Sequence, residues 1–344
     1  MTPFQSPDLE TWRALYDAAI RFKNLAPWEW MDETDIFGVQ DPESGRVGFV
    51  SIMGKLGEHF GLSAYLDAMA LYQYWELAET PSLATPQKLL EIEQLTASFE
   101  NREELTTKDR KVIKKLGLRF RGRKAWPLFR KIIPGYLPWH IEAHDARFLM
   151  HILEQAILVA QRTREEPELL YPDEDESIEY LIRVPRETED GLVWEDAWRE
   201  VPPPDEEFPI YMDFALLEHV RNLPRADATI EMDLFPLRST VKDDEGRPFI
   251  PYMLMAVDRD SGMILEGRLL SPEPNLWEMQ GRIPIYILET FAKLGAVPKQ
   301  ILIQSEFLEE FLEMLSEELP LNYQRKRSLR QLESARRALQ EFLG

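Results

Sequence analysis

The chain has 344 residues, 44% of them apolar, which suits two domains with a core each and excludes disorder of the whole chain. Its 61 acidic and 40 basic residues give a formal charge of −21, so the average surface repels phosphate backbones and anionic membranes. There is no cysteine, which excludes disulfides, thiolate nucleophiles and cysteine metal sites. No signal-peptide pattern opens the chain and no apolar run reaches roughly eighteen residues, so we expect a soluble cytoplasmic protein without membrane contact.

The first domain is predicted over residues 1–164 as an α+β domain. Ser6 as N-cap and Pro7 at the first helical position predict a helix that ends near residue 25. Two apolar runs around the turn sequence DPESG predict a β-hairpin of residues 36–39 and 47–53. Helices are expected at 62–77, 87–100, 108–116 and 141–162, a short strand at 118–123, and an irregular segment at 126–139.

Residues 165–224 are predicted to be an acidic linker with a possible hairpin at 180–186 and 193–201. The second domain is predicted over residues 225–344, around an apolar hairpin at 249–270 whose turn, DRDSG, has the chemistry of the first one. Strands are expected at 229–237, 250–257, 263–270, 300–304 and 321–323, and helices at 276–294, 307–318 and 328–343. This order predicts a mixed sheet covered by helices.

That order, βββαβα, resembles the ribonuclease H-like fold, as a likeness of topology over residues 225–344. The segments PWEWM with DPESGRVGFVSIMGKLGEHFGLSAYL, LRFRGRKAWPLFRK leading to PGYLPWH, and RPFIPYMLMAVDRDSGMIL resemble bacterial proteins that join two domains of unknown function. The resemblance spans nearly the whole chain. It implies a two-domain soluble bacterial protein and carries over no catalytic residue.

The strongest local anomaly in charge is a run of eleven basic residues against Asp109 alone: Lys108, Arg110, Lys111, Lys114, Lys115, Arg119, Arg121, Arg123, Lys124, Arg130 and Lys131. Phe120, Trp126 and Phe129 are interleaved, where bases could stack. In a strand at 118–123, alternate side chains would share one face. The candidates for polyanion binding are therefore Arg119, Arg121, Arg123, Lys124 and Trp126. The competing interpretation is that this face pairs with acidic segments of the protein itself, such as residues 165–176.

Two other patterns have a functional and a structural interpretation. Gly54, Gly57 and Gly61 stand between a predicted strand and a predicted helix, where a phosphate can bind, but their spacing matches no nucleotide motif and favours a tight turn. His140 and His144 could chelate a metal with a third ligand, whereas hydrogen-bonded histidines at a helix boundary are the expected arrangement. We expect no metal site and no cofactor.

A ribonuclease H-like domain would hold two divalent ions with carboxylates on its first strand, after its fourth strand and on a helix. Asp233 lies on the predicted first strand, and Glu306 and Glu310 are the weaker candidates after the fourth. The set is incomplete. The first hypothesis is therefore a non-enzymatic binding or protein-interaction protein with a protein partner. The alternative is a nucleic-acid-binding protein, or a metal-dependent nuclease with a degenerate site.

Overall fold

The computed structural model describes residues 5–80, 86–171, 178–189, 191–204, 209–237, 239–243, 246–273 and 275–343. The chain divides into two compact units. The first comprises Met1–Ile133 with Pro138–Glu206, and the second comprises Pro134–Leu137 with Glu207–Gly344. Among the described residues, no helix is long and apolar enough to cross a membrane.

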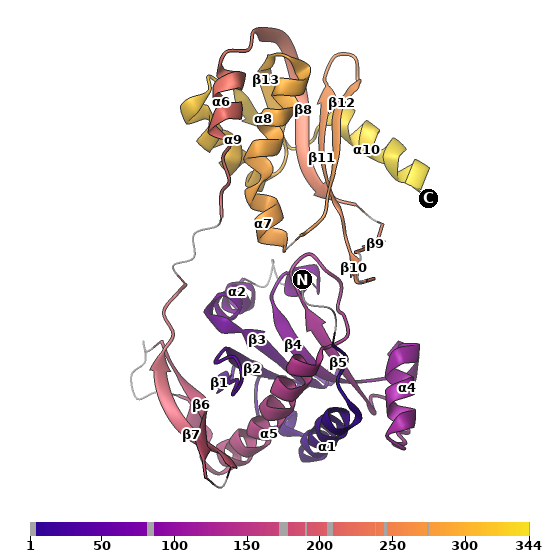
Figure 1. The fold of residues 1–344 in the computed structure, drawn as a ribbon, viewed down its shortest axis with the longest axis vertical. Helices are drawn as coiled ribbons and strands as arrows, with labels where there is room; N and C mark the ends of the chain where they lie inside the picture. Colours follow the sequence, from indigo (N-terminus) through magenta and orange to yellow (C-terminus); the bar gives the residue numbers. More distant parts are fainter. Residues whose placement is uncertain are drawn as a thin grey trace. The chain divides into compact units, whose positions relative to one another are not determined.

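A seven-stranded mixed sheet forms the centre of the first unit, in the order β5-β4-β3-β2-β1-β6-β7 (Figure 1). Its strands are β1 (Phe37–Gln40), β2 (Val47–Met53), β3 (Gly61–Leu66), β4 (Gln94–Glu100), β5 (Trp126–Ile132), β6 (Glu179–Thr188) and β7 (Gly191–Glu200). β1 pairs with β6 in parallel, and every other neighbouring pair is antiparallel. The hairpin that was assigned to the linker therefore supplies two strands to this sheet.

Helices cover both faces of the first sheet (Figure 1). On one face α1 (Leu9–Leu25) and α5 (Ala143–Glu165) pack over a core that includes Phe22, Val50 and Leu149. On the other face α2 (Asp67–Glu79) covers a smaller cluster with Phe49 and Leu71. The shorter helical segments are η1 (Pro27–Glu29), α3 (Pro86–Leu89), η2 (Arg102–Glu104), α4 (Thr107–Lys115) and η3 (Pro167–Leu170).

Five predictions for the first unit are wrong. The helix expected at 62–77 contains β3 in its first part, and the helix expected at 87–100 contains β4 in its second part. The expected strand at 118–123 is a loop, and the segment at 126–139 contains β5. The predicted N-cap, Ser6, gives way to Asp8, whose carboxylate accepts the N–H of Thr11 at 2.8 Å.

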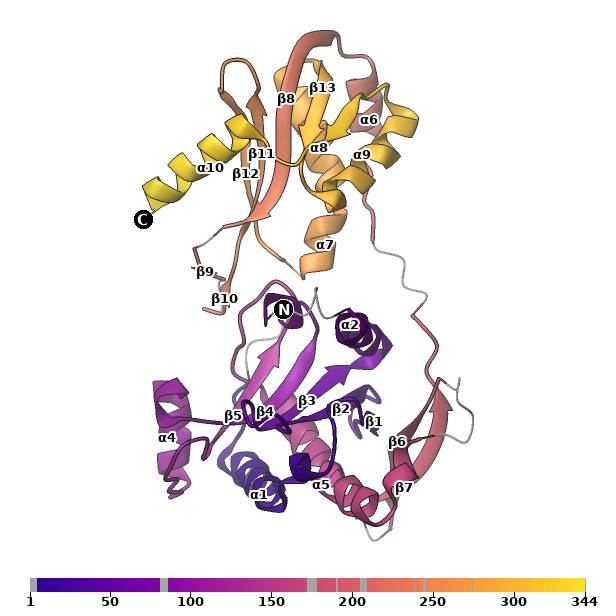
Figure 2. The same ribbon diagram turned by 180° about the vertical axis from the view of Figure 1, so that it is seen from behind.

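The second unit contains a five-stranded mixed sheet in the order β12-β11-β8-β13-β14 (Figure 2). Its strands are β8 (Arg225–Pro236), β11 (Tyr252–Asp258), β12 (Ile264–Leu270), β13 (Val297–Ile303) and β14 (Tyr323–Arg325), and β9 (Val241–Lys242) with β10 (Pro248–Phe249) forms a separate pair. β11 is antiparallel to β8 and β12, whereas β13 is parallel to β8 and β14. The expected mixed sheet is confirmed, and the likeness to ribonuclease H stays a prediction.

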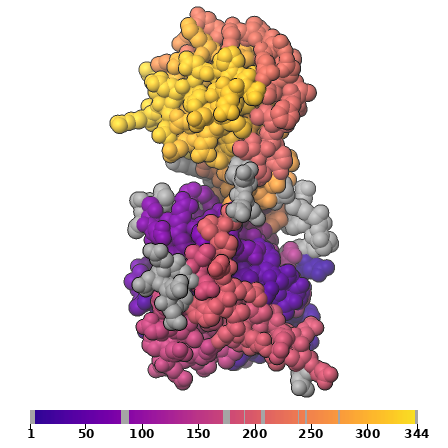
Figure 3. Space-filling model, turned by 90° about the vertical axis from the view of Figure 1, so that its left-hand side faces the viewer, coloured from indigo at the N-terminus to yellow at the C-terminus, as the bar shows by residue number. Residues whose placement is uncertain are grey.

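Helices lie on both faces of this sheet as well. α6 (Phe214–Arg221), α7 (Leu276–Gly281), α8 (Ile283–Leu294) and α9 (Glu306–Glu318) share one core. α10 (Arg330–Leu343) covers the opposite face through Leu332, together with Leu329 just before the helix, and the residues of this end of the chain are yellow in Figure 3. The buried Glu231 on β8 accepts the N–H of Leu332 at 2.8 Å and so caps α10. An expected single helix at 276–294 is two helices, α7 and α8.

Candidate polyanion-binding site

α4 directs its basic side chains to solvent because its apolar side chains point into the core. Ile113 is 4% exposed and belongs to the core of the first unit. The exposed side chains on the remaining surface of the helix include Arg110, Lys111, Lys114 and Lys115. The last two lie in the final turn, where the helix dipole favours cations. The predicted basic helix is therefore present and exposed.

Asp109 attaches α4 to the first sheet. Its carboxylate accepts the Thr106 N–H at 2.8 Å, which completes a capping box at the start of the helix. Arg130 on β5 donates to both of its oxygens, at 3.0 and 2.7 Å, and His140 Nδ1 lies 3.5 Å away. Burial raises the pKa of Asp109, but the bonds from His140 and Arg130 outweigh burial and hold this pKa well below its usual value. The only acid of the basic run thus has a structural role.

The loop after α4 presents arginines without being a strand. Gly117 and Gly122 adopt φ of 72° and 99°, a region that breaks a strand and that glycine enters without strain. Phe120 is half-buried against Tyr16, with ring centroids 6.2 Å apart, so it anchors the loop. The side chains of Arg119, Arg121 and Arg123 are exposed. The shared strand face that was predicted for these arginines is therefore wrong, although all three side chains reach the surface from the loop.

A hollow of about 680 Å³ lies between α4, this loop and η2, and we call it the basic hollow. Five cationic side chains and no acidic one line it: Arg102, Arg110, Lys114, Arg119 and Arg121. The predicted candidates Arg123 and Lys124 do not line it. Arg102 lies outside the basic run, after Asn101 and before Glu103 and Glu104. Its local sequence therefore does not indicate a basic site. Only the fold brings it to the hollow.

An aromatic and aliphatic floor distinguishes the basic hollow from a plain charged surface. Leu118, Phe120 and Trp126 line it together with the cations. The Trp126 and Phe120 rings meet edge to face with centroids 5.7 Å apart. The guanidinium of Arg102 lies 5.9 Å from the Trp126 ring. A ligand that carries both a phosphate and a planar apolar group finds a partner for each.

Three cations of the predicted run have a largely buried acidic partner, which distinguishes them from the cations of the basic hollow. Lys124, Arg130 and Lys131 form ion pairs with Glu100, Asp109 and Asp145, and all three acids are largely buried. Throughout the part of the chain that the structure describes, no ion pair joins the cations of the basic hollow to an acid. Of the acidic segment at 165–176 that was expected to pair with this run, residues 172–176 lie outside the described residues.

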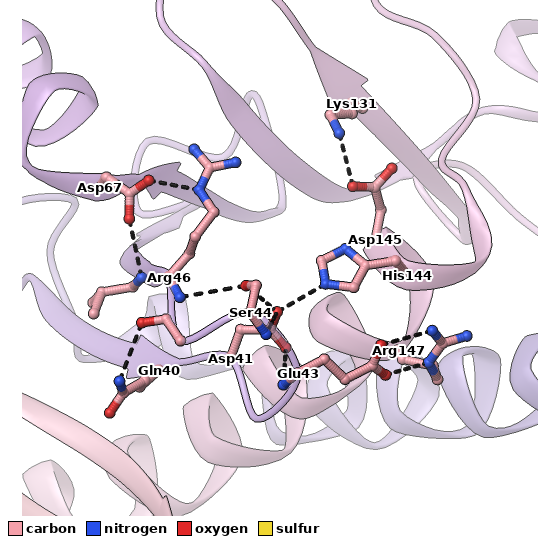
Figure 4. A network of polar contacts seen from close by, with 12 residues as sticks. Gln40, Asp41, Glu43, Ser44, Arg46, Asp67, Lys131, His144, Asp145 and Arg147 are labelled. Carbon is pink, nitrogen blue, oxygen red and sulfur yellow. Dashed lines mark hydrogen bonds and ion pairs between the residues drawn. The ribbon is translucent and has the colours of Figure 1, made fainter. Parts of the chain in front are cut away.

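The turn of the first hairpin is bonded to α5 (Figure 4). Asp41, 2% exposed, accepts the Ser44 hydroxyl at 2.5 Å and lies 2.9 Å from His144 Nε2. Glu43 pairs with Arg147 on the same helix. Hydrogen bonds from Ser44 and from backbone N–H groups, with the charge of His144, outweigh burial and lower the pKa of Asp41. This cluster stabilises the turn, because its polar groups bond to one another and to α5.

The second hairpin repeats the same turn without the helix. Asp258 accepts the Ser261 N–H at 2.8 Å and its hydroxyl at 2.6 Å, as Asp41 does with Ser44. Gly262 and Gly45 adopt φ of 72° and 76°. The interpretation of these aspartates as turn-forming residues is confirmed.

The histidines at 140, 144 and 151 have separate partners, so His140 and His144 do not share one site. His140 precedes α5 and contacts Asp109, and His144 contacts Asp41. His151 lies on α5 with its ring 5.6 Å from the Trp194 ring, and burial lowers its pKa. No group of three metal-binding side chains is found in the described ranges.

The glycines at 54, 57 and 61 belong to a strand-to-strand connection, so the helix start that a phosphate would need is absent there. A Cβ on Gly61 would lie 2.3 Å from the Ala97 carbonyl oxygen, and one on Gly54 would lie 2.8 Å from Trp28. Both glycines allow close packing, which agrees with the structural interpretation.

The carboxylates proposed for catalysis lie in different surroundings. Asp233 on β8 is 7% exposed and accepts the Ser305 N–H at 3.2 Å. Burial raises its pKa to about 6. Glu306 is exposed and pairs with Arg325 at 3.1 Å, and Glu310 is exposed on α9. Glu306 is therefore directed to Arg325, while Asp233 lies on the face that α10 covers.

Comparisons with known proteins agree with the two units. One family model, Domain of unknown function (DUF7309), matches residues 12–183, half of the chain. A second, Domain of unknown function (DUF6930), matches residues 216–340. No curated protein matches the chain. The chain belongs to the family of the Domain of unknown function (DUF7309) and carries a Domain of unknown function (DUF6930) after it.

Proposed function

We propose that this protein is a non-catalytic binding protein whose first domain holds single-stranded nucleic acid in the basic hollow. The observation that carries the proposal is the combination of five cations without an acidic partner and an aromatic floor in one concave site. Clustered arginine and lysine favour phosphates, and aromatic rings favour exposed bases. A soluble cytoplasmic location and a bacterial source belong to the same proposal.

Size and shape favour a single strand over a duplex. Small-ligand sites enclose roughly 300 to 1,000 Å³, and the hollow of about 680 Å³ falls within that range. It therefore suits one or two unstacked bases, while the phosphates on either side of them follow the exposed cations. Bases inside a duplex are not free to stack on Trp126, whereas each base of a single strand that does stack adds about 1 to 3 kcal/mol. An acidic peptide would use the cations but would leave Trp126 and Phe120 without a planar partner.

The salt dependence has a stated size. If each of the five cations neutralises one phosphate, the logarithm of the binding constant falls with a slope of about −3.5 against the logarithm of salt concentration. Raising salt from about 50 to about 200 mM then weakens binding roughly a hundredfold. This behaviour comes from counterion release and needs no base sequence preference.

The test is a fluorescence-anisotropy titration of the full chain with a labelled oligothymidine and with a duplex of equal length, at two salt concentrations. We expect tighter binding to the single strand and a loss of at least about tenfold in Arg119→Glu/Arg121→Glu. The matched control is Lys242→Glu/Arg259→Glu, which makes the same charge change at exposed positions of the second unit. Equal losses in both variants, or no binding at low salt, would overturn the proposal. Binding of a polyglutamate peptide as tight as that of the oligothymidine would point to an acidic protein ligand instead.

A further inference from the structure

The outer edge of β7 is the one long sheet edge that lacks protection in the described part of the chain. Unpaired edges invite pairing with another strand, and proteins usually shorten, bend or cover them. The outer edge of β5 pairs with Trp139, which exchanges two bonds of 2.9 Å with Lys131. β12 carries a bulge near its start and β14 has three residues. β7 has ten residues, pairs with β6 along its whole length without a register shift, and lies on the surface in Figure 3.

The backbone of β7 offers a regular row of donors and acceptors on this edge. Val201 donates its N–H to the Ile178 carbonyl at 3.1 Å, so odd-numbered residues of β7 bond to β6 and even-numbered residues point outward. Within the described residues, no strand pairs with that side. The Trp194 carbonyl accepts a bond of 3.1 Å from Arg183, and a carbonyl has a second lone pair for another donor.

The side chains of β7 are complementary to themselves in one antiparallel register. On the α2 face the order is Val193, Glu195, Ala197, Arg199 and Val201, because alternate residues share a face. Pairing with a second copy about Ala197 places valine opposite valine and glutamate opposite arginine, twice each. Glu195 and Arg199 are both exposed. Within one copy Glu195 pairs with Arg186 at 2.7 Å and Arg199 donates to Gln40 at 3.5 Å, and such exposed contacts exchange readily for pairs across the new strands.

We propose that two copies of this chain associate by antiparallel pairing of their β7 strands about Ala197, which joins their first sheets into one. Neighbouring registers are worse, because pairing about Glu195 or Asp196 places that acid opposite itself. The proposed register also covers exposed apolar side chains, among them Val193 at 38% and Trp198 at 41%.

The opposite face of β7 supports the same register. There Trp198 lies opposite Asp196 of the second copy. Asp196 is held by Arg162 and Arg183, so the indole would lie beside guanidinium groups, which favour an aromatic face. The exposed Trp198 ring would thus gain cationic neighbours when the two strands pair.

Charge reversal tests the register itself. Glu195→Arg and Arg199→Glu each replace two opposite-charge pairs by two like-charge pairs, so we expect each variant to weaken self-association by at least about tenfold in sedimentation velocity. A mixture of the two variants restores both pairs and forms a heterodimer. The matched control is Arg13→Glu, which makes the same charge change at an exposed position of α1, and it should associate like the unaltered chain.

The outcomes separate the proposal from its alternatives. A chain that remains monomeric up to about 100 μM overturns it and leaves the edge for a strand of a different protein. A dimer that ignores both reversals, or a mixture that does not pair, places the interface elsewhere and also overturns it. Unchanged melting of each variant, checked by circular dichroism, shows that the measured loss concerns association. None of these readouts depends on a ligand in the basic hollow.

Discussion

Replacing Asp109 by asparagine should loosen α4 and with it the basic hollow. The Asp109 and Arg130 side chains are only 11% and 12% exposed, so their two hydrogen bonds form almost out of water. Removing one charge of such a pair leaves the other uncompensated and costs about 3 to 5 kcal/mol, while an asparagine still caps the helix. We therefore expect the unfolding free energy of the first domain to fall by about 3 kcal/mol or more.

Urea denaturation and hydrogen exchange of residues 107–123 measure this loss globally and locally. The matched control is Asp227→Asn, which breaks the ion pair with Lys299 where the two side chains are 86% and 67% exposed, and it should change little. The pKa of Asp109 is lowered, so its stabilisation is present above about pH 4 and lost as pH falls. The variant should lack that acid-side loss. If Asp109→Asn is no less stable than the control, the assignment of Asp109 as the anchor of α4 is wrong.

Asp233→Asn should stabilise the second domain at pH 7, by at most about 3 kcal/mol, because burial raises the pKa of this carboxyl from its ordinary value of 3.8 to about 6. In the unaltered chain the free energy of unfolding should decline as pH rises from about 4 to about 6. A pH series of denaturation curves should show no such decline in the variant, and an equal decline in both proteins would contradict the burial of this carboxyl. Asp41→Ala should cost about 2 to 4 kcal/mol and lower the melting temperature more than Asp258→Ala, because only Asp41 is buried and bonded to His144. Equal shifts in calorimetry would show that the contact with α5 adds nothing.

Helices that begin at a capping residue and bury only one face could be predicted from the sequence. Strands that are buried on both faces could not. α4 begins at a capping box and α9 at a serine N-cap, and both were found within two residues. β3 is buried at all six positions, so it shows no alternation and its apolar run merges with that of α2. In residues 118–123 the alternation mimics a strand, and the two glycines with positive φ override it.

The sequence predicts only those residues of the candidate site that lie within one charged run. Charge density identifies the run, and residues such as Arg119 and Arg121 follow from it. Arg102 joins the basic hollow only because η2 lies beside the loop, which no local pattern encodes. The sequence also does not separate Lys124 from Arg121, since what distinguishes them is a buried acid, Glu100, that is distant along the chain.

This separation of the cations bears directly on the ligand. A chain with 61 acidic residues has carboxylates available for every lysine and arginine. Where the fold needs a cation, as for Arg130 and Lys131, a buried acid accompanies it. The cations of the basic hollow instead lie close to one another with no acid in the lining, an arrangement that costs repulsion in the empty protein. A polyanion relieves that repulsion when it binds, so the same grouping that is unfavourable for folding is favourable for the complex.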